Sequence, residues 1–226
     1  MIKETFTRHE LSGLELKDKM KKKIFYKLLR DELSYSHITY KIGLNKDRRQ
    51  FKLDNYYIGL GFTTLECIFN NISNNTKIAI IEICDDSKVF VINPDEFITD
   101  KFIINEIIDL RIFINSSLEI SKIAVGCDYE ILRYIDNQTD DICRIGLNIN
   151  GLAIEYIRNQ TPELCHLAVT KDGMSIQFIN KQTRILCELA VQQTCLAILY
   201  CEYKTKTMYN IIQKKNPFMI KYIVLE

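Results

Sequence analysis

The chain of 226 residues has no tryptophan, only three prolines and eight glycines, and almost no net charge. Its 30 basic and 29 acidic residues leave a net charge of +1, so the chain as a whole does not attract nucleic acid or an anionic membrane. No apolar run approaches the roughly 20 residues that span a bilayer, and the first nine residues are polar and charged, unlike a secretory signal. These absences predict a soluble intracellular protein that does not bind a membrane.

Patterns for metal binding and disulfides are also missing, although the chain has eight cysteines. No Cys-x-x-Cys pair occurs, and the three histidines do not cluster with cysteines at metal-ligand spacing. Cys143, Cys165 and Cys187 recur on one face of the expected helices, which places their Cα atoms roughly 8 to 10 Å apart. A disulfide needs less than about 7 Å. We therefore expect buried core thiols, no metal and no cofactor.

The feature that the sequence does contain is a 22-residue repeat in its second half. The pairs Gln138-Thr139, Gln160-Thr161 and Gln182-Thr183 recur at this interval. A frame that begins at Ser117 divides the rest of the chain into five units without insertions, namely 117–138, 139–160, 161–182, 183–204 and 205–226. Such periodicity predicts an array in which each unit packs on its neighbours.

Each unit contains two apolar runs with helical spacing. The first run covers positions 4, 5 and 7 to 9 of the unit, and the second covers positions 14 to 16 and 18 to 19. Turn dipeptides such as Asn150-Gly151 separate the runs, and Thr161 stands where a helix cap belongs, before Pro162. A small residue at position 8, such as Ala168, lets neighbouring units approach closely. The sequence thus predicts an α-solenoid of five helix-turn-helix repeats over residues 117–226.

Residues 1–116 lack the repeat and predict a small α+β domain. Residues 14–33 have the apolar spacing of an amphipathic helix, and residues 63–72 also suit a helix. Short strand-like runs cover 56–62, 78–83 and 89–92. Residues 99–115 are apolar, and their pattern fits a helix and a strand equally well. We place the domain boundary near residues 113–117, and the fold class is therefore α+β.

Candidate chemistry in the N-terminal part is sparse. The basic run that includes Lys17 and Lys23 is flanked by acids and has no interleaved aromatic residues, so we expect a solvated helix face and no nucleic acid. Lys46, Arg48 and Arg49 are also basic but lie much later in the sequence. The segment Gly59-Leu60-Gly61 lacks the further residues of a phosphate-binding loop and suits a tightly packed strand.

The repeat columns resemble a known repeat. The segment 159–169, Asn-Gln-Thr-Pro-Glu-Leu-Cys-His-Leu-Ala-Val, is similar to units found in proteins of mimivirus-like giant viruses. Upstream, the segments 40–45, 58–63 and 99–104 look like degenerate copies of three motifs that precede such repeats in that family. The use of many Ile, Asn, Lys and Tyr residues is typical of an AT-rich genome. The resemblance implies an uncharacterised viral protein located in the host cytoplasm, at the viral factory, or in the virion.

From this we expect a protein-interaction module, a scaffold or adaptor that counters a host or competitor protein, without catalytic activity. The candidate partner surface consists of two variable columns, at positions 6 and 17 of the repeat. Its residues are Arg144, His166 and Glu188 in the first column and Arg133, Glu155 and Gln177 in the second.

An alternative is that the N-terminal domain is an enzyme or binds a nucleotide. The segment 61–64 is loosely similar to the central strand of ADP-ribosyltransferase-like folds, with the repeats then serving as a targeting domain. However, Gly61 replaces the usual aromatic residue, and no His or Arg with a paired Glu can be assigned. Ser-His-Asp and Cys-His sets are likewise unsupported.

The last unit predicts self-association. It carries apolar residues at positions that would face outward, and no capping helix follows it in the sequence. We expect its edge to be buried against a second copy or a partner protein, and a two-fold homodimer is the default because such a contact closes on itself. The competing expectation is a monomer in which nearby lysines shield this end. The candidate dimer edge consists of Phe218, Ile220 and Tyr222.

Overall fold

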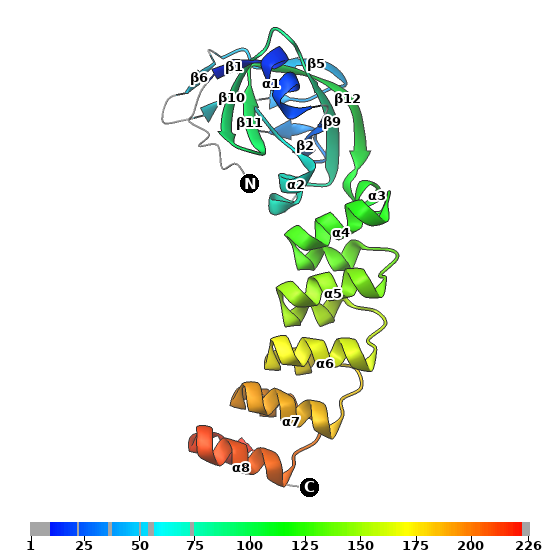
Figure 1. The fold of residues 1–226 in the computed structure, drawn as a ribbon, viewed down its shortest axis with the longest axis vertical. Coiled ribbons are helices and arrows are strands. Elements are labelled where there is room, and N and C mark those ends of the chain that lie inside the picture. The colour runs from blue at the N-terminus through cyan, green and yellow to red at the C-terminus, as the bar shows by residue number, and fades with distance from the viewer. Residues whose placement is uncertain are drawn as a thin grey trace. The chain divides into compact units, whose positions relative to one another are not determined.

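The computed structural model describes residues 10–21, 23–35, 38–49, 51–53, 57–72 and 75–222. The chain divides into two compact units, Met1–Phe113 and Ile114–Glu226 (Figure 1). We call them the sheet unit and the helical stack. No helix among the described residues combines the length and the hydropathy that a membrane crossing requires.

The sheet unit is built mainly of strands. They are β1 (Glu10–Ser12), β2 (Phe25–Leu29), β3 (Ser34–Tyr35), β4 (Ile38–Thr39), β5 (Gly43–Lys46), β6 (Lys52–Leu53), β7 (Tyr57–Ile58), β8 (Leu60–Thr63), β9 (Lys77–Ile83), β10 (Lys88–Asn93), β11 (Glu96–Thr99) and β12 (Lys101–Asp109). Its helices are α1 (Gly13–Met20), α2 (Leu65–Ile68), the 3-10 helix η1 (Phe69–Asn71) and α3 (Leu110–Ile114), which reaches the unit boundary.

Eight of these strands form one antiparallel sheet in the order β1-β10-β11-β8-β2-β9-β12-β5. Two further pairs, β3 with β4 and β6 with β7, stand outside it. The prediction of a small α+β domain followed by an α-solenoid of helix-turn-helix repeats is therefore wrong, because a large antiparallel sheet makes up most of the first unit.

The expected helix over residues 14–33 is wrong beyond Met20. Helix α1 ends there, because Lys21 takes a left-handed conformation with φ of 44°, and β2 begins at Phe25. Strand β2 lies between β8 and β9 in the middle of the sheet and buries residues on both faces, so its apolar residues do not alternate. The ambiguous residues 99–115 contain the long strand β12, which pairs with β9 and β5.

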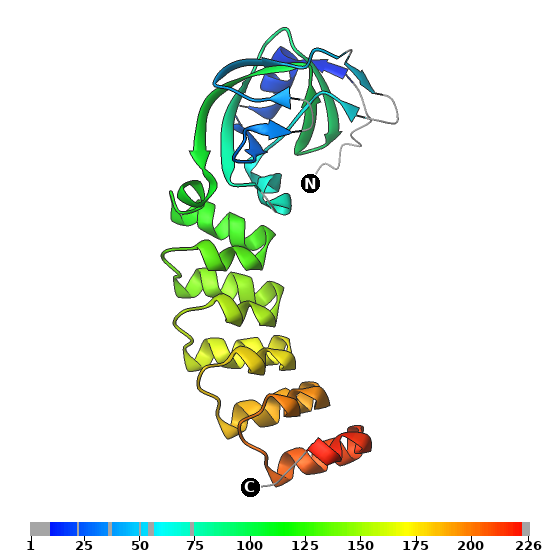
Figure 2. The same ribbon diagram turned by 180° about the vertical axis from the view of Figure 1, so that it is seen from behind.

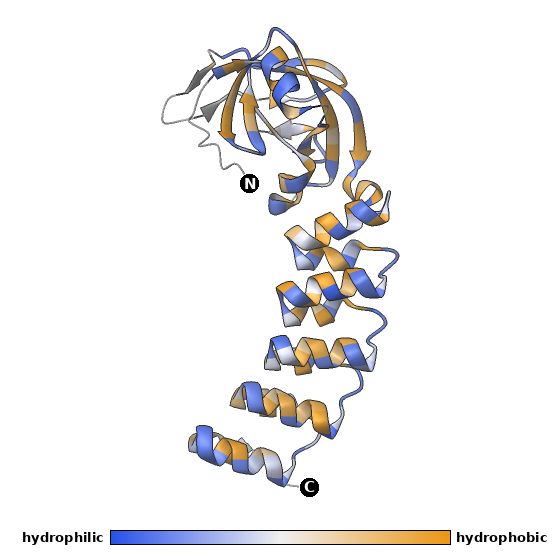
Figure 3. Ribbon diagram, in the orientation of Figure 1, coloured by the Kyte–Doolittle hydropathy of each residue, from blue (hydrophilic) through white to orange (hydrophobic). Residues whose placement is uncertain are grey.

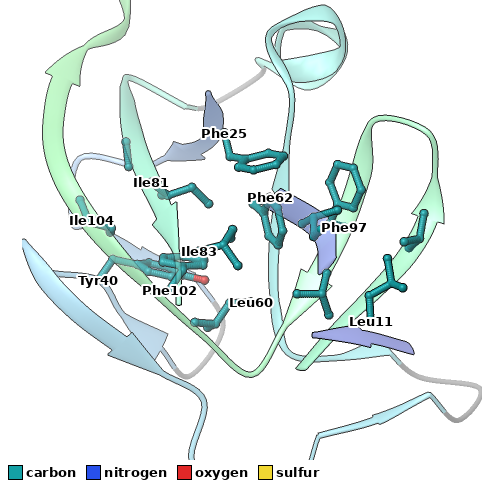
Figure 4. Close-up of a cluster of buried hydrophobic side chains, with 14 of the residues drawn as sticks. Leu11, Phe25, Tyr40, Leu60, Phe62, Ile81, Ile83, Phe97, Phe102 and Ile104 are labelled. Atoms are coloured by element: carbon teal, nitrogen blue, oxygen red, sulfur yellow. The ribbon is translucent and has the colours of Figure 1, made fainter. Parts of the chain in front are cut away.

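Aromatic side chains fill the centre of the sheet unit (Figure 4). The ring of Phe62 stacks on Phe97 and meets Phe25 edge-on, with centroids 5.1 and 5.3 Å apart. The ring of Tyr40 stacks on Phe102 at 6.2 Å. These rings come from β2, β8, β11 and β12 and from the residue that follows β4, so the core joins distant parts of the sequence.

The helical stack repeats one pattern, an α-helix followed by a 3-10 helix (Figure 2). The α-helices are α4 (Leu118–Cys127), α5 (Asp140–Ile149), α6 (Pro162–Lys171), α7 (Arg184–Gln193) and α8 (Lys206–Lys215). The 3-10 helices are η2 (Tyr129–Tyr134), η3 (Gly151–Tyr156), η4 (Gly173–Phe178), η5 (Cys195–Leu199) and η6 (Pro217–Tyr222). Successive α-helices begin 22 residues apart, which is the interval in the sequence.

The second segment of each unit is a correction to the predicted helix-turn-helix repeat, because it is a 3-10 helix of five or six residues and no α-helix. The α-helices contact the α-helices of the next unit, and the 3-10 helices contact the next 3-10 helices, so the stack has two layers. Figure 3 shows hydrophobic and hydrophilic residues mixed along each helix, as expected where one side packs and the other faces water.

Candidate interaction surface

Side-chain caps position both segments of a unit. The hydroxyl of Thr139, Thr161 or Thr183 accepts a hydrogen bond from the backbone N–H three residues later, which confirms the predicted helix caps. Asn150 and Asp172 cap the 3-10 helices in the same way, through the N–H two residues later. These two residues are extended, with φ near −150°, so Asn-Gly and Asp-Gly mark a helix start here instead of a tight turn.

The glycine after each of these caps is required by the neighbouring unit. A Cβ atom at Gly151 would lie 2.5 Å from the carbonyl oxygen of Ala168, and one at Gly173 would lie 2.6 Å from that of Ala190. Glycine is therefore required here because the units approach each other closely. Backbone conformation is not the reason, because neither Gly151 nor Gly173 has a positive φ.

The repeated glutamine joins consecutive units. The Nε2 of Gln160 donates to the carbonyl oxygens of Ile154 and Phe178 at 3.1 and 2.8 Å, and its Oε1 accepts from the N–H of Asn180 at 2.9 Å. Gln138 and Gln182 make the same three bonds one unit earlier and one unit later. Each side chain thereby satisfies backbone groups at the ends of two 3-10 helices. We call these residues the glutamine ladder.

The structure separates the six candidate partner residues into two rows. Arg144, His166 and Glu188 lie on α5, α6 and α7, in the α-helical layer. Arg133, Glu155 and Gln177 lie on η2, η3 and η4, in the 3-10 layer. Each column of the sequence therefore forms one row along the stack. The structure does not show that the two rows belong to a single surface.

Several of these side chains have partners within the stack. The Nε of Arg144 lies 2.6 Å from the carboxylate of Asp140, and Glu188 accepts from the hydroxyl of Thr205 at 2.7 Å. The guanidinium of Arg133 lies 4.6 Å from the ring centre of Tyr156 and also pairs with Glu130. Gln177 donates to the carbonyl of Met174 within its own 3-10 helix. His166 is exposed on α6.

The last two residues of the second row line a common depression. Glu155 and Gln177 line a depression of 410 Å³ between η3 and η4, together with Arg158 and Asn180. The glutamine ladder forms part of its wall through Gln160. This polar depression suits hydrogen bonding to a partner more than burial of an apolar side chain.

The strongest apolar feature of the stack is a group of exposed side chains on its last two 3-10 segments. Leu196, Leu199 and Tyr200 follow the i, i+3, i+4 spacing of one helix face, and about half of each side chain is exposed. Phe218 occupies the same repeat position as Leu196 one unit later, and η6 contacts η5. It is 88% exposed. We call these four residues the apolar patch.

The other two residues of the predicted dimer edge differ from Phe218. Ile220 is half-buried and shares its repeat position with Ile176 and Ile198, which are fully buried. It therefore belongs to a core position. The side chain of Tyr222 lies outside the described part of the structure. Sequence reasoning missed Leu196, Leu199 and Tyr200 as members of one patch, although position 17 changes from Gln177 to Leu199 in this unit.

The thiols include one contact that the repeat spacing did not predict. The Sγ of Cys201 donates to the carbonyl oxygens of Ala197 and Cys187 at 3.2 and 3.8 Å, and the Sγ of Cys187 donates to Oε1 of Gln182 at 3.1 Å. The proximity of the two thiols lowers the pKa of Cys187 and raises the pKa of Cys201. Burial raises the pKa values of Cys143 and Cys165. Among the described residues, no group of three or more His, Cys, Asp or Glu side chains is arranged to hold a metal ion.

The sheet unit contains a buried lysine. Strands β2 and β8 pair only through Tyr26 and Thr63, and the ammonium of Lys27 reaches β8, where it donates to the carbonyl oxygen of Gly61 at 2.8 Å. It also lies 5.0 Å from the ring centre of Tyr40. Burial lowers the pKa of Lys27 to about 8. A cavity of 480 Å³ beside this point is lined by Thr63, Cys67 and Glu96, and its lining contains no His or Arg among the residues that the structure describes.

Comparison of the chain with protein-family models, with curated proteins and with solved structures yields no match.

Proposed function

We propose that this chain is a protein-interaction module, in which the helical stack presents the binding surface and no catalysis takes place. The observation that carries the proposal is the apolar patch. Leu196, Leu199, Tyr200 and Phe218 expose large apolar side chains on adjacent segments. The positions of Leu196 and Leu199 are half-buried or polar in the earlier units, whereas the position of Tyr200 is also exposed at Tyr134. Exposed contiguous apolar surface of this kind marks protein contact sites.

A second copy of the chain is the partner that we propose for this patch, in a two-fold homodimer. Aromatic and aliphatic side chains of the type found here form the buried centres of homodimer interfaces. An isologous contact buries the same patch on both copies and closes the assembly. The polar rows and the depression beside Glu155 and Gln177 remain accessible for a further protein partner.

The resemblance to repeat proteins of mimivirus-like giant viruses supports a role as a viral scaffold or adaptor in the host cytoplasm or the virion. The alternative of a degenerate ADP-ribosyltransferase-like domain has less support, because the described residues that line the cavity beside Gly61 and Thr63 include no His or Arg to act with Glu96.

The homodimer is tested by replacing Leu199 and Phe218 with aspartate and measuring the mass by light scattering at micromolar concentration. We expect twice the chain mass for the unchanged protein and the single-chain mass for the variant, since two buried charges oppose association. The matched control is Gln177→Asp, at the repeat position of Leu199 one unit earlier, which should keep the dimer. A monomeric unchanged protein, or a variant that still dimerises, contradicts the proposal.

A further inference from the structure

A hollow of 660 Å³ lies on the sheet unit, beside the segment from Lys41 to Arg49. Among the described residues, four cationic side chains line it, Lys41, Lys46, Arg48 and Arg49, together with the carboxylate of Asp47. The whole chain has a net charge of only +1, so positive charge is concentrated at this place. The hollow belongs to the sheet unit, and its role goes beyond the proposed interaction function.

The segment around the hollow is held in one conformation by two buried polar side chains. The Nδ2 of Asn45 donates to the carbonyl oxygens of Lys41 and Gly43 at 2.7 and 2.8 Å, and its Oδ1 accepts from the N–H of Lys41 at 3.0 Å. The carboxylate of Asp47 accepts from the N–H, Nε and Nη2 of Arg49 at 3.0, 3.1 and 2.7 Å. The side chains that border the hollow therefore start from a fixed backbone.

Arg49 is neutralised by this pairing, but three cations are not. Lys41, Lys46 and Arg48 are exposed, and within the described residues none of them forms an ion pair or hydrogen bond through its side chain. The charge of Lys46 contributes to lowering the pKa of Asp86, but the carboxylate of Asp86 accepts its hydrogen bond from Lys101. Within the part of the chain that the structure describes, three cations without an ion-pair partner consequently face one hollow.

We propose that this hollow binds a phosphate-bearing ligand that carries at least two phosphate groups. Phosphates take charge-assisted hydrogen bonds from Lys and Arg, and three cations match the charge of a diphosphate. The volume lies within the range of small-ligand sites, roughly 300 to 1,000 Å³. Leu44 and Ile38 add an apolar wall that suits an organic group attached to the phosphates. Both a free organic diphosphate and a phosphoinositide headgroup have this chemistry.

The test is isothermal titration of the full chain with inorganic pyrophosphate, together with sedimentation on phosphatidylcholine vesicles with and without a phosphoinositide bisphosphate. The variant replaces Lys41, Lys46 and Arg48 with alanine. We expect pyrophosphate to bind the unchanged protein, and its affinity to fall by roughly tenfold or more in the variant and to weaken as salt is added. Additional sedimentation only with phosphoinositide vesicles identifies the lipid-bound form as the ligand, and its absence identifies the free form.

The control variant removes the same charge elsewhere, by alanine at Lys171, Lys181 and Lys206, which are exposed in the helical stack. It should bind pyrophosphate as the unchanged protein does. A second variant with Lys41→Arg, Lys46→Arg and Arg48→Lys keeps the charges and should retain binding. No binding of pyrophosphate to the unchanged protein overturns the proposal, and so does an equal loss of affinity in the two alanine variants.

Discussion

Ser175 illustrates, at the scale of single residues, how the stack tolerates a local defect. Its hydroxyl is fully buried and makes no hydrogen bond. The same repeat position holds Ala153 and Ala197 in the adjacent units, where no polar atom needs a partner. A hydroxyl moved from water into an apolar core without a partner loses its hydrogen bonds to water.

We therefore predict that Ser175→Ala stabilises the helical stack by about 1 to 2 kcal/mol. The control is Ser121→Ala, because the hydroxyl of Ser121 is also buried but donates to the carbonyl oxygens of Ile114 and Ser117 at 2.8 and 3.1 Å. Its loss should destabilise the stack by about 1 kcal/mol. Urea denaturation measures both changes, and a lower midpoint for Ser175→Ala disagrees with the structure.

At the scale of elements, each 3-10 helix is stabilised mainly by its neighbours. A segment of five or six residues does not persist alone in water. The glutamine ladder supplies hydrogen bonds between successive segments, and the capping residues Asn150 and Asp172 supply bonds at their starts. The sequence pattern showed two helical segments per unit, but α and 3-10 helices share apolar spacing over so short a length, and the pattern did not distinguish them.

We predict that Gln160→Ala destabilises the stack by about 2 kcal/mol or more, because it leaves the carbonyl of Phe178 and the N–H of Asn180 without this partner. The carbonyl of Ile154 loses one of its two hydrogen bonds and keeps the one from the N–H of Ile157. Gln177→Ala is the matched control. That glutamine is exposed and bonds only within its own 3-10 helix, so the change should stay within about 0.5 kcal/mol. Chemical denaturation followed by circular dichroism compares the two, and equal effects would show that the ladder contributes little.

At the scale of the whole molecule, the pH dependence of stability includes a contribution from Lys27. Its pKa is about 8 in the folded protein, below its ordinary value of 10.5. The unfolded chain therefore binds more protons between pH 8 and 10.5, and the free energy of unfolding of the sheet unit rises with pH across this window. Below pH 8 the amine is charged in both states, and the cost of burying that charge is constant.

We predict that Lys27→Met removes this rise, which amounts to at most about 3 kcal/mol, so that the curves of the variant and the unchanged protein converge or cross towards pH 10.5. Lys19→Met, at an exposed position on α1, is the control and should leave the slope unchanged. Urea unfolding at a series of pH values from 7 to 10.5 measures the slopes. Identical slopes for the unchanged protein and Lys27→Met contradict burial of a chargeable amine.

The three segments 40–45, 58–63 and 99–104 become neighbours only in the fold. Segments 40–45 and 99–104 meet where β5 pairs with β12, and their rings Tyr40 and Phe102 stack. Phe62 of segment 58–63 lies edge-on to Phe102. Their order along the chain was visible in the sequence, whereas their pairing required strands far apart in sequence to hydrogen-bond.

The sequence by itself determined the period of the stack, the helix caps at Thr139, Thr161 and Thr183, and the buried small residues at position 8, because each of these depends on local spacing and on one neighbouring unit. Only the tertiary structure decided the eight-stranded sheet, the contact between Cys187 and Cys201, and the hollow around Lys46. Strands such as β2, buried on both faces, have no alternating pattern, and contacts between distant residues leave no periodic trace in a single sequence.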